Sequence, residues 1–187
     1  MRQDFIYGVD LGWVSQLEKQ GIAWTDKYGN TVEPIQALKE MGATAVRLRV
    51  FVNPPESAMW QKPKKQAYGR EFGGEVCMLG LCDSQNVLKM AQRVKNLDMD
   101  LMIDFHYSDH FADPIYQDIP QEWKTLDQNG LKQKVREHTK EVLTLLSEHN
   151  IYPDWVQVGN EINSGILLPV GSSSGNPQFL VELLNTG

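Results

Sequence analysis

The amino-acid sequence predicts an α/β fold in which four short strands alternate with four helices around a parallel sheet. Four apolar segments of strand length each precede a segment with helical periodicity. Polar side chains gather at the C-terminal ends of these strands, where α/β barrels and open sheets keep their active sites. A complete eightfold barrel needs about 250 residues. The 187 residues therefore supply about the first four βα units of a (β/α)8 TIM barrel, as one domain over residues 1–187.

The composition is that of an ordinary globular domain, with 41% hydrophobic and 22% charged residues. A formal net charge of -6 and the lack of a long Lys/Arg block argue against nucleic acid or an anionic membrane as the main partner. No apolar stretch approaches the roughly 18 residues that span a bilayer. Residues 1–3 lead into a strand without a signal-peptide core, so we expect a soluble chain that carries no targeting signal.

The first unit begins with a strand candidate at residues 5–10, FIYGVD, and continues through a long connection over residues 11–30. Trp13 lies just after the strand, on the side where an active site is expected. Residues 33–41 have the apolar spacing of a helix, and Gly42 provides its C-terminal stop. Together these segments form one βα unit.

The second unit begins with residues 44–51, TAVRLRVF, in which the apolar residues share one face of a strand. Arg47 and Arg49 share the other face, and two arginines on a buried strand need anionic partners. Residues 52–81 form a long irregular insert. A helix follows from residue 83 or 84 to about residue 97.

The third unit begins with residues 100–106, DLMIDFH, which alternate apolar and polar side chains. Asp104 and His106 lie on the polar face, near the C-terminal end of the strand. A loop over residues 107–129 is rich in Asp, Pro and aromatic residues. Residues 131–150 then show the clearest helical pattern in the chain.

The fourth unit begins with residues 154–162, DWVQVGNEI, a short apolar strand that ends in Asn160 and Glu161. Residues 163–176 form a loop rich in Gly and Ser, which no Lys-Ser/Thr pair follows, so it is not a phosphate-binding loop. Residues 177–187 begin a fourth helix.

Six polar residues from the ends or inward faces of consecutive strands are expected to converge on one pocket. Such a set suits acid/base chemistry on a neutral polar substrate: a glutamate donates a proton, an asparagine holds a hydroxyl, and Arg and His side chains orient the carboxylate. The alternative is a buried ion network without catalytic use. The six residues are Arg47, Arg49, Asp104, His106, Asn160 and Glu161.

The segment DFHYSDHFAD raises the alternative of a metal-dependent hydrolase, because it crowds together Asp104, His106, Asp109, His110 and Asp113. Two His residues four apart on a strand and its loop need not share a face, as they do on a helix. We therefore expect neither a metal nor another cofactor.

Several aromatic and cysteine residues leave alternatives open. Aromatic side chains in or beside the rim loops could stack on sugar rings or simply pack within the loops. We expect Trp155 in the core, and we assign no role to His138 and His149, which the pattern places toward solvent or at a helix end. A local disulfide between Cys77 and Cys82 is possible, whereas a zinc site is not indicated. The rim aromatics are Trp13, Trp60, Trp123, Tyr107, Phe111 and Tyr116.

Four sequence motifs in this order, the third of them in two parts, LMIDFHYSD with FADP, resemble those of glycoside hydrolase family 53, the endo-β-1,4-galactanases. The resemblance covers nearly the whole chain. It implies a (β/α)8 barrel from the clan of retaining glycosidases whose catalytic glutamates end strands four and seven. It also implies a substrate, the β-1,4-galactan of pectin side chains and type I arabinogalactan. The motifs are GVDLGW (8–13), AVRLRVFVNP (45–54), LMIDFHYSD (101–109), FADP (111–114) and PDWVQVGNEINSGIL (153–167).

The resemblance also assigns roles to individual residues. Glu161 matches the acid/base, and Asn160 the neighbour that holds the substrate 2-hydroxyl. Arg47 and His106 match positions that line the subsite beside the scissile bond. The predicted substrate-binding set is Asn160, Arg47, Arg49, His106, Asp104, Asp10, Trp13 and Trp123.

The nucleophile of the family would lie on strand seven, beyond residue 187. We therefore expect this chain to be a fragment that has little activity alone and that associates with the missing half of the barrel, or with itself, through open sheet edges. The substrate implies a secreted or cell-envelope enzyme. A non-catalytic half-barrel that binds galactan remains the alternative function.

Overall fold

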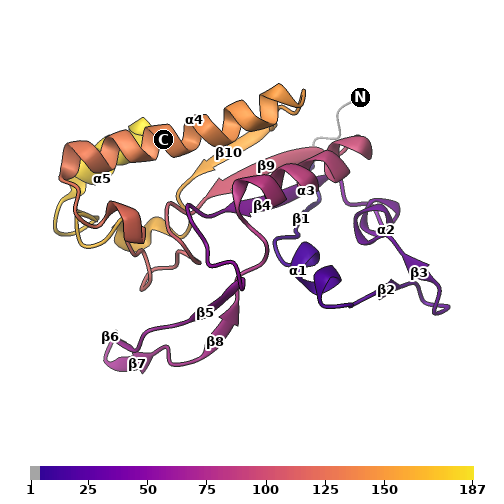
Figure 1. Cartoon of the computed structure of the whole chain (residues 1–187), viewed down its shortest axis with the longest axis horizontal. Helices are drawn as coiled ribbons and strands as arrows, with labels where there is room; N and C mark the ends of the chain where they lie inside the picture. The colour runs from indigo at the N-terminus through magenta and orange to yellow at the C-terminus, as the bar shows by residue number, and fades with distance from the viewer. Residues whose placement is uncertain (1–4) are drawn as a thin grey trace.

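The computed structural model describes residues 5–187 and contains one four-stranded parallel sheet with helices against one face (Figure 1). The expectation for residues 1–3 lies outside the described residues. The strands lie in the sheet in the order in which they occur along the chain, which confirms the predicted half-barrel topology. They are β1 (Gly8–Asp10), β4 (Ala45–Val50), β9 (Asp100–Phe105) and β10 (Trp155–Val158).

The two central strands alternate apolar and polar side chains, as a sheet with one covered face requires. Val46 and Leu48 on β4 and Ile103 on β9 are buried in the main hydrophobic core. The helices α3 (Ser84–Asn96) and α4 (Gln128–Glu148) lie above this face of the sheet in Figure 1. The other face holds the polar side chains of β4 and β9, together with the apolar Met102.

The four predicted helices are present, and acidic or amide side chains cap their N-termini. Asp83 accepts hydrogen bonds from two backbone N–H groups of α3, and Asp127 accepts one from α4. Such caps satisfy donors that have no partner within the helix. Among residues 5–187, no helix combines the length and the apolar character needed to cross a membrane. The other two helices are α2 (Pro34–Glu40), capped by Glu33, and α5 (Pro177–Thr186), capped by Asn176.

The connections contain short elements that the sequence pattern did not predict. Residues 11–32 include a helix and a small hairpin, and the loops after β9 and β10 contain two 3-10 turns and a small ladder. Elements of two to six residues are too short to show a clear period. They are α1 (Val14–Lys19), β2 (Trp24–Thr25), β3 (Thr31–Val32), η1 (Gln121–Trp123), η2 (Ile162–Ser164), β11 (Gly165–Ile166) and β12 (Gly171–Ser172).

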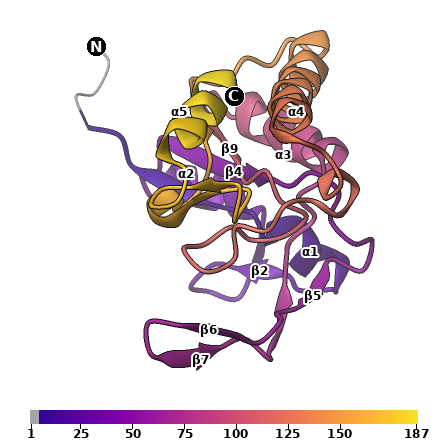
Figure 2. The same ribbon diagram turned by 90° about the vertical axis from the view of Figure 1, so that its left-hand side faces the viewer.

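The predicted irregular insert is an ordered arm that projects from the rest of the fold in both views (Figures 1 and 2). Two antiparallel ladders, β5 with β8 and β6 with β7, form the arm. Trp60 on β5 stacks on His110 with ring centroids 3.8 Å apart, and Lys65 on β6 pairs with Asp118 at 2.6 Å. These contacts dock the arm on the loop after β9. Its strands are β5 (Met59–Gln61), β6 (Lys65–Ala67), β7 (Arg70–Phe72) and β8 (Val76–Met78).

The sheet face away from the helices is only partly covered. Trp155, expected in the core, is instead half-buried here and lines a hollow of about 450 Å3 beside Met102.

Val156 on the edge strand β10 is 40% exposed, and Ile6 just before the other edge strand is 47% exposed. Both edges of the sheet thus carry apolar groups in contact with solvent.

The expectation that His138 faces solvent is wrong, because the side chain is buried between α4 and the sheet. Its ring lies 5.7 Å from that of Phe105, 6.2 Å from that of Tyr107 and 6.3 Å from that of Trp123, measured between centroids. This burial lowers the pKa of His138 to about 4. The imidazole is therefore neutral in the folded chain near neutral pH.

We expect His138 to make the folded chain sensitive to mild acid. The unfolded chain takes up a proton on this residue below its ordinary pKa of 6.5, whereas the folded chain resists protonation down to about 4. As the pH falls from 6.5 to about 4, the free energy of unfolding should therefore fall further in the wild type than in a variant without the imidazole. The difference should be about 3 kcal/mol. Urea denaturation across this range checks the difference with His138→Gln. The variant His149→Gln is the matched control, because it removes an imidazole that the fold leaves exposed.

Candidate active site

The C-terminal ends of the four sheet strands border a cleft of about 870 Å3. Most of the predicted site residues line it, although they come from four separate segments of the sequence. Asp104 does not line the cleft but lies fully buried beside it. The predicted residues that line the cleft are Asp10, Trp13, Arg47, Arg49, His106, Asn160 and Glu161.

The two arginines of β4 find their predicted anionic partner in Asp10 on the neighbouring strand β1. Arg47 Nε lies 2.9 Å from Asp10 Oδ2, and Arg49 Nη2 pairs with Asp10 Oδ1. Burial alone would raise the pKa of Asp10, but the charges of both arginines and the hydrogen bonds from Arg49 and the Gly12 N–H outweigh it and lower the pKa. Asp10 is therefore a fixed anion in this site.

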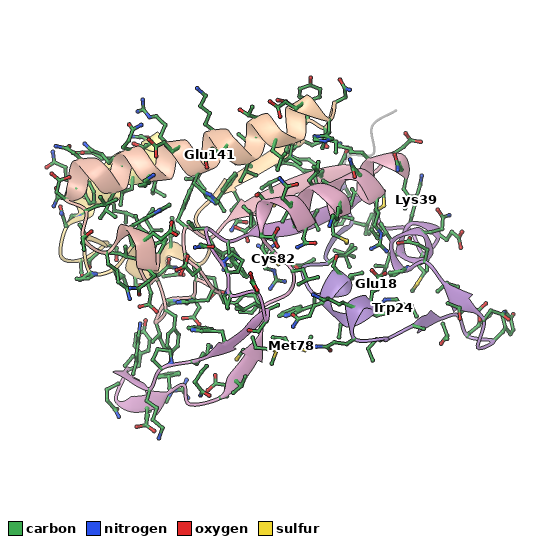
Figure 3. All side chains as sticks on the ribbon, viewed as in Figure 1. Glu18, Trp24, Lys39, Met78, Cys82 and Glu141 are labelled. Carbon is green, nitrogen blue, oxygen red and sulfur yellow. The ribbon has the colours of Figure 1, made fainter. Side chains whose placement is uncertain are left out.

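Arg49 also supports the aromatic wall of the cleft. Its guanidinium carbon lies 4.2 Å from the ring centroid of Trp13 and 4.9 Å from that of Phe111. The indole Nε1 of Trp13 donates a 2.9 Å hydrogen bond to the carbonyl of Met78, at the end of β8 (Figure 3). Trp13 is nevertheless 40% exposed. The cleft thus contains an anchored aromatic surface that is still open to a ligand.

His106 borders the cleft, but both of its ring nitrogens face groups of the protein. Nδ1 accepts a 2.9 Å hydrogen bond from the backbone N–H of Ala112, while Nε2 lies 3.2 Å from Asp104 Oδ2. Burial lowers the pKa of His106 despite the nearby carboxylate, so the ring is neutral and its proton belongs on Nε2. The predicted contact between His106 and a substrate therefore cannot use a free ring nitrogen in this arrangement.

A closed ring of polar contacts orients the side chain of Asn160. Asn160 Nδ2 donates to the Ala112 carbonyl at 2.7 Å, and its Oδ1 accepts from Gln157 Nε2 at 3.3 Å. Arg47 Nη1 completes the ring, 3.3 Å from Gln157 Oε1 and 3.5 Å from Asp104 Oδ2. Because an amide nitrogen carries two protons, Asn160 retains one N–H beyond the bond to Ala112.

Glu161 follows at the point where β10 turns into η2. Its backbone adopts the left-handed conformation, with φ 47° and ψ 47°, which is uncommon for a residue other than glycine. The side chain is exposed and lines the cleft. The site thus contains an accessible carboxyl group beside an oriented amide, as the sequence predicts.

The arrangement does not favour the metal-dependent alternative. Among residues 5–187, no three His, Cys, Asp or Glu side chains gather where they could hold a metal ion. The two histidines of the DFHYSDHFAD segment have different partners, His106 facing Asp104 and His110 lying 3.2 Å from Asp118. Strand and loop geometry has separated residues that are close in sequence.

Three of the aromatic residues predicted in or beside the rim loops are buried, which agrees with the packing alternative and not with stacking on sugar rings. Trp123 is 3% exposed and packs in the main hydrophobic core, so the structure does not bring it to the cleft. Tyr107 and Tyr116 are each 1% exposed. Trp60 docks the arm. Only Trp13 and Phe111 of the rim set line the cleft.

The two cysteines are free thiols, so the possible local disulfide is not formed. Cys82 lies between β8 and α3 (Figure 3), and its Sγ donates to the carbonyl of Gly12 at 3.3 Å. Burial raises the pKa of this thiol to about 12. Cys82 is therefore an inert structural group, whereas Cys77 lines the cleft.

Sequence reasoning missed Gln157 and Ala112 as parts of the site. Gln157 lies two residues after Trp155 on β10, so strand alternation alone could have placed it on the open face. Ala112 takes part only through its backbone N–H and carbonyl. No side-chain pattern could have revealed such a role.

Comparisons with known proteins agree on one family. Residues 6–187 match the family described as glycosyl hydrolase family 53. The endo-beta-1,4-galactanase of Bacillus subtilis (strain 168) is 32% identical over 88% of this chain and 35% of its own length. The arabinogalactan endo-beta-1,4-galactanase of Cellvibrio japonicus (strain Ueda107) is 34% identical over 87% of this chain and 38% of its own length.

Solved structures give the same result for the fold. The Ignisphaera aggregans GH53 catalytic domain superimposes with a TM-score of 0.81 and 36% identity, over 98% of this chain and 46% of that domain. A structure from a study of two fungal beta-1,4-galactanases gives a TM-score of 0.79 and 29% identity, over 97% of this chain and 47% of its own. The chain thus spans less than half the length of these relatives.

Proposed function

The chain belongs to glycosyl hydrolase family 53, and we propose that the whole protein hydrolyses internal β-1,4-galactosidic bonds of galactan and type I arabinogalactan with retention of configuration. The observation that carries this proposal is the position of Glu161 beside Asn160, at the end of β10 and in the cleft. The endo-beta-1,4-galactanase of Bacillus subtilis, whose sequence matches most of this chain, supports the choice of substrate.

Retaining hydrolysis gives the residues of the cleft distinct tasks. Glu161 protonates the departing glycosidic oxygen and later takes a proton from the attacking water. The remaining N–H of Asn160 is available to the 2-hydroxyl of the sugar, where a hydrogen bond strengthens in the transition state. The open face of Trp13 can stack on a galactose ring.

The reaction also needs a second carboxylate about 5 to 5.5 Å from the first, to attack the anomeric carbon. The other carboxylates that line the cleft are Asp10 and Asp113. Asp10 is paired with two arginines, while Asp113 Oδ1 accepts the N–H groups of Ile115 and Tyr116 and Oδ2 lies 3.5 Å from Lys62. Neither is free to attack, and we place the nucleophile in the barrel units that these residues do not include.

We therefore expect the 187-residue chain to release no reducing sugar from galactan. Its counterpart is a completed chain, in which these residues are joined to the part of the Ignisphaera aggregans GH53 catalytic domain that they do not match. The completed chain contains both carboxyl groups and should hydrolyse galactan. A reducing-sugar assay on the two proteins at equal concentration measures the difference. Turnover by the 187-residue chain alone would refute the need for a second half.

A galactan-binding half-barrel is the second candidate, favoured by the anchored and 40% exposed Trp13. Calorimetry with galacto-oligosaccharides separates the two functions. A binder retains its affinity in the 187-residue chain, and the completed chain then shows no turnover. An enzyme shows turnover in the completed chain, whatever the affinity of the 187 residues alone.

A further inference from the structure

We propose that Gln117, in the loop between β9 and η1, is a positioning residue for the acid/base Glu161. The inference rests on the proposed function of Glu161. Gln117 lies outside the cleft lining and is 1% exposed, so it cannot contact a substrate there. It acts on the catalytic segment through the main chain.

The side-chain amide of Gln117 holds two consecutive carbonyl groups. Gln117 Nε2 donates to the carbonyl of Asn160 at 2.7 Å and faces the carbonyl of Glu161 at 3.3 Å. An amide nitrogen has two protons, so one side chain can serve both acceptors. These two carbonyls flank the Cα atom of Glu161, so the contacts restrain the backbone dihedral angles of that residue.

The restraint matters because the backbone of Glu161 is left-handed. Residues with a Cβ atom disfavour this conformation and adopt it only where the surroundings impose it. With φ at 47°, the side chain leaves the chain in a direction that an extended or right-handed backbone would not give. If the two carbonyls are released, Glu161 can relax to a negative φ and its carboxyl group turns away from the cleft.

Gln117 also contacts the loop that follows Glu161, at Leu168. Its own carbonyl accepts a 2.7 Å hydrogen bond from the N–H of Leu168, and Asp118 forms a parallel bridge with Leu168. The segment from Asn160 to Leu168 is thus held at both ends by Gln117 and its neighbour. Ala112, five residues before Gln117 in the loop after β9, accepts a hydrogen bond from the side chain of Asn160 at its carbonyl. One loop therefore orients both members of the catalytic pair.

The test compares Gln117→Met with a matched variant, Gln16→Met. Gln16 is 3% exposed, donates from Nε2 to the carbonyl of Ala58 at 3.0 Å and accepts at Oε1 from the Gly80 N–H at 2.7 Å. Each substitution removes a buried amide that bonds to two backbone groups, so the two variants should lose similar thermal stability. Only the first should disturb Glu161.

The first readout uses the isotope-labelled 187-residue chain and needs no galactan. A positive φ brings the amide proton of a residue close to its own Hα, which gives a strong nuclear Overhauser effect within that residue. We expect this effect at Glu161 in the wild type and in Gln16→Met, and its loss in Gln117→Met. Gln117→Leu, which likewise lacks an N–H donor, should behave like Gln117→Met. An undisturbed Glu161 in both Gln117 variants overturns the proposal.

The second readout is the kinetics of the completed chain. Misplacement of an acid/base group by about 1 Å lowers kcat by roughly 100-fold, so Gln117→Met should lose that much in kcat with little change in KM. Gln16→Met should keep the wild-type kcat. Equal kcat values in the two variants would reduce Gln117 to a structural role. If the wild-type completed chain fails to hydrolyse galactan, the proposed function fails, while the magnetic resonance result still decides whether Gln117 sets the backbone of Glu161.

Discussion

Replacement of Glu161 with glutamine is expected to lower the kcat of galactan hydrolysis by about 100- to 10,000-fold in the completed chain, the range found when a general acid/base is lost. The amide has nearly the shape of the carboxyl group but cannot transfer the proton. Because Glu161 lies exposed at the cleft, the substitution should leave the fold unchanged. Stopped assays of reducing ends measure kcat, and calorimetry with galacto-oligosaccharides measures the retained affinity.

Two controls separate loss of the acid/base from general damage. Glu182→Gln removes a carboxylate on α5 that pairs with Lys132 of α4 at 2.7 Å. Glu182 does not line the cleft, so this variant should keep full activity. In Glu161→Gln, azide should restore turnover of an aryl galactoside with a good leaving group, because azide needs no general base to attack the glycosyl intermediate. Full activity in Glu161→Gln would remove Glu161 from the mechanism.

The sheet and its active-site edge can be predicted from the sequence because strand periodicity and chain order carry the information. In TAVRLRVF and DLMIDFH every second residue is apolar, so one face must be covered and the other holds Arg47, Arg49 and Asp104. Right-handed connections between parallel strands then place the strands in chain order. Residues from distant segments, such as Asp10 and Glu161, thereby reach one cleft.

The parts that sequence reasoning missed depend on contacts that leave no periodic pattern. His138 lies on a helix whose polar residues mostly face solvent, but the aromatic rings of Phe105 and Trp123 bury it. Trp123 itself lies in a loop, yet that loop folds back onto the core. Ala112 serves the site through backbone atoms, and the role of Gln117 depends on which carbonyls face its amide. Only the tertiary structure reveals such pairings.

Asp10→Ala should be the most destabilising substitution within the site. Arg49 is 6% exposed, so loss of its carboxylate partner leaves a charged group in a poorly solvated position. Breaking one partner of a buried ion pair costs about 3 to 5 kcal/mol. We expect a value near 3 kcal/mol, because Asp10 is 27% exposed and because Arg47 keeps its contacts to Asp104 and Gln157. Urea denaturation of the 187-residue chain at neutral pH measures the change in the free energy of unfolding.

The double variant Asp10→Ala/Arg49→Met shows whether the unpaired charge of Arg49 causes the loss of stability in Asp10→Ala. An apolar pair of similar volume can replace a buried ion pair at little cost, and methionine can still pack against Trp13 and Phe111, which flank the guanidinium. The double variant should therefore recover most of the stability that Asp10→Ala loses. If both proteins are equally unstable, the loss instead reflects the Gly12 N–H, which donates to Asp10 Oδ1 at 3.1 Å, and the turn that it closes. The difference in stability between the single and double variants thus shows which contact of Asp10 matters more. It is either the ion pair that neutralises Arg49 or the hydrogen bond from the Gly12 N–H that closes the turn.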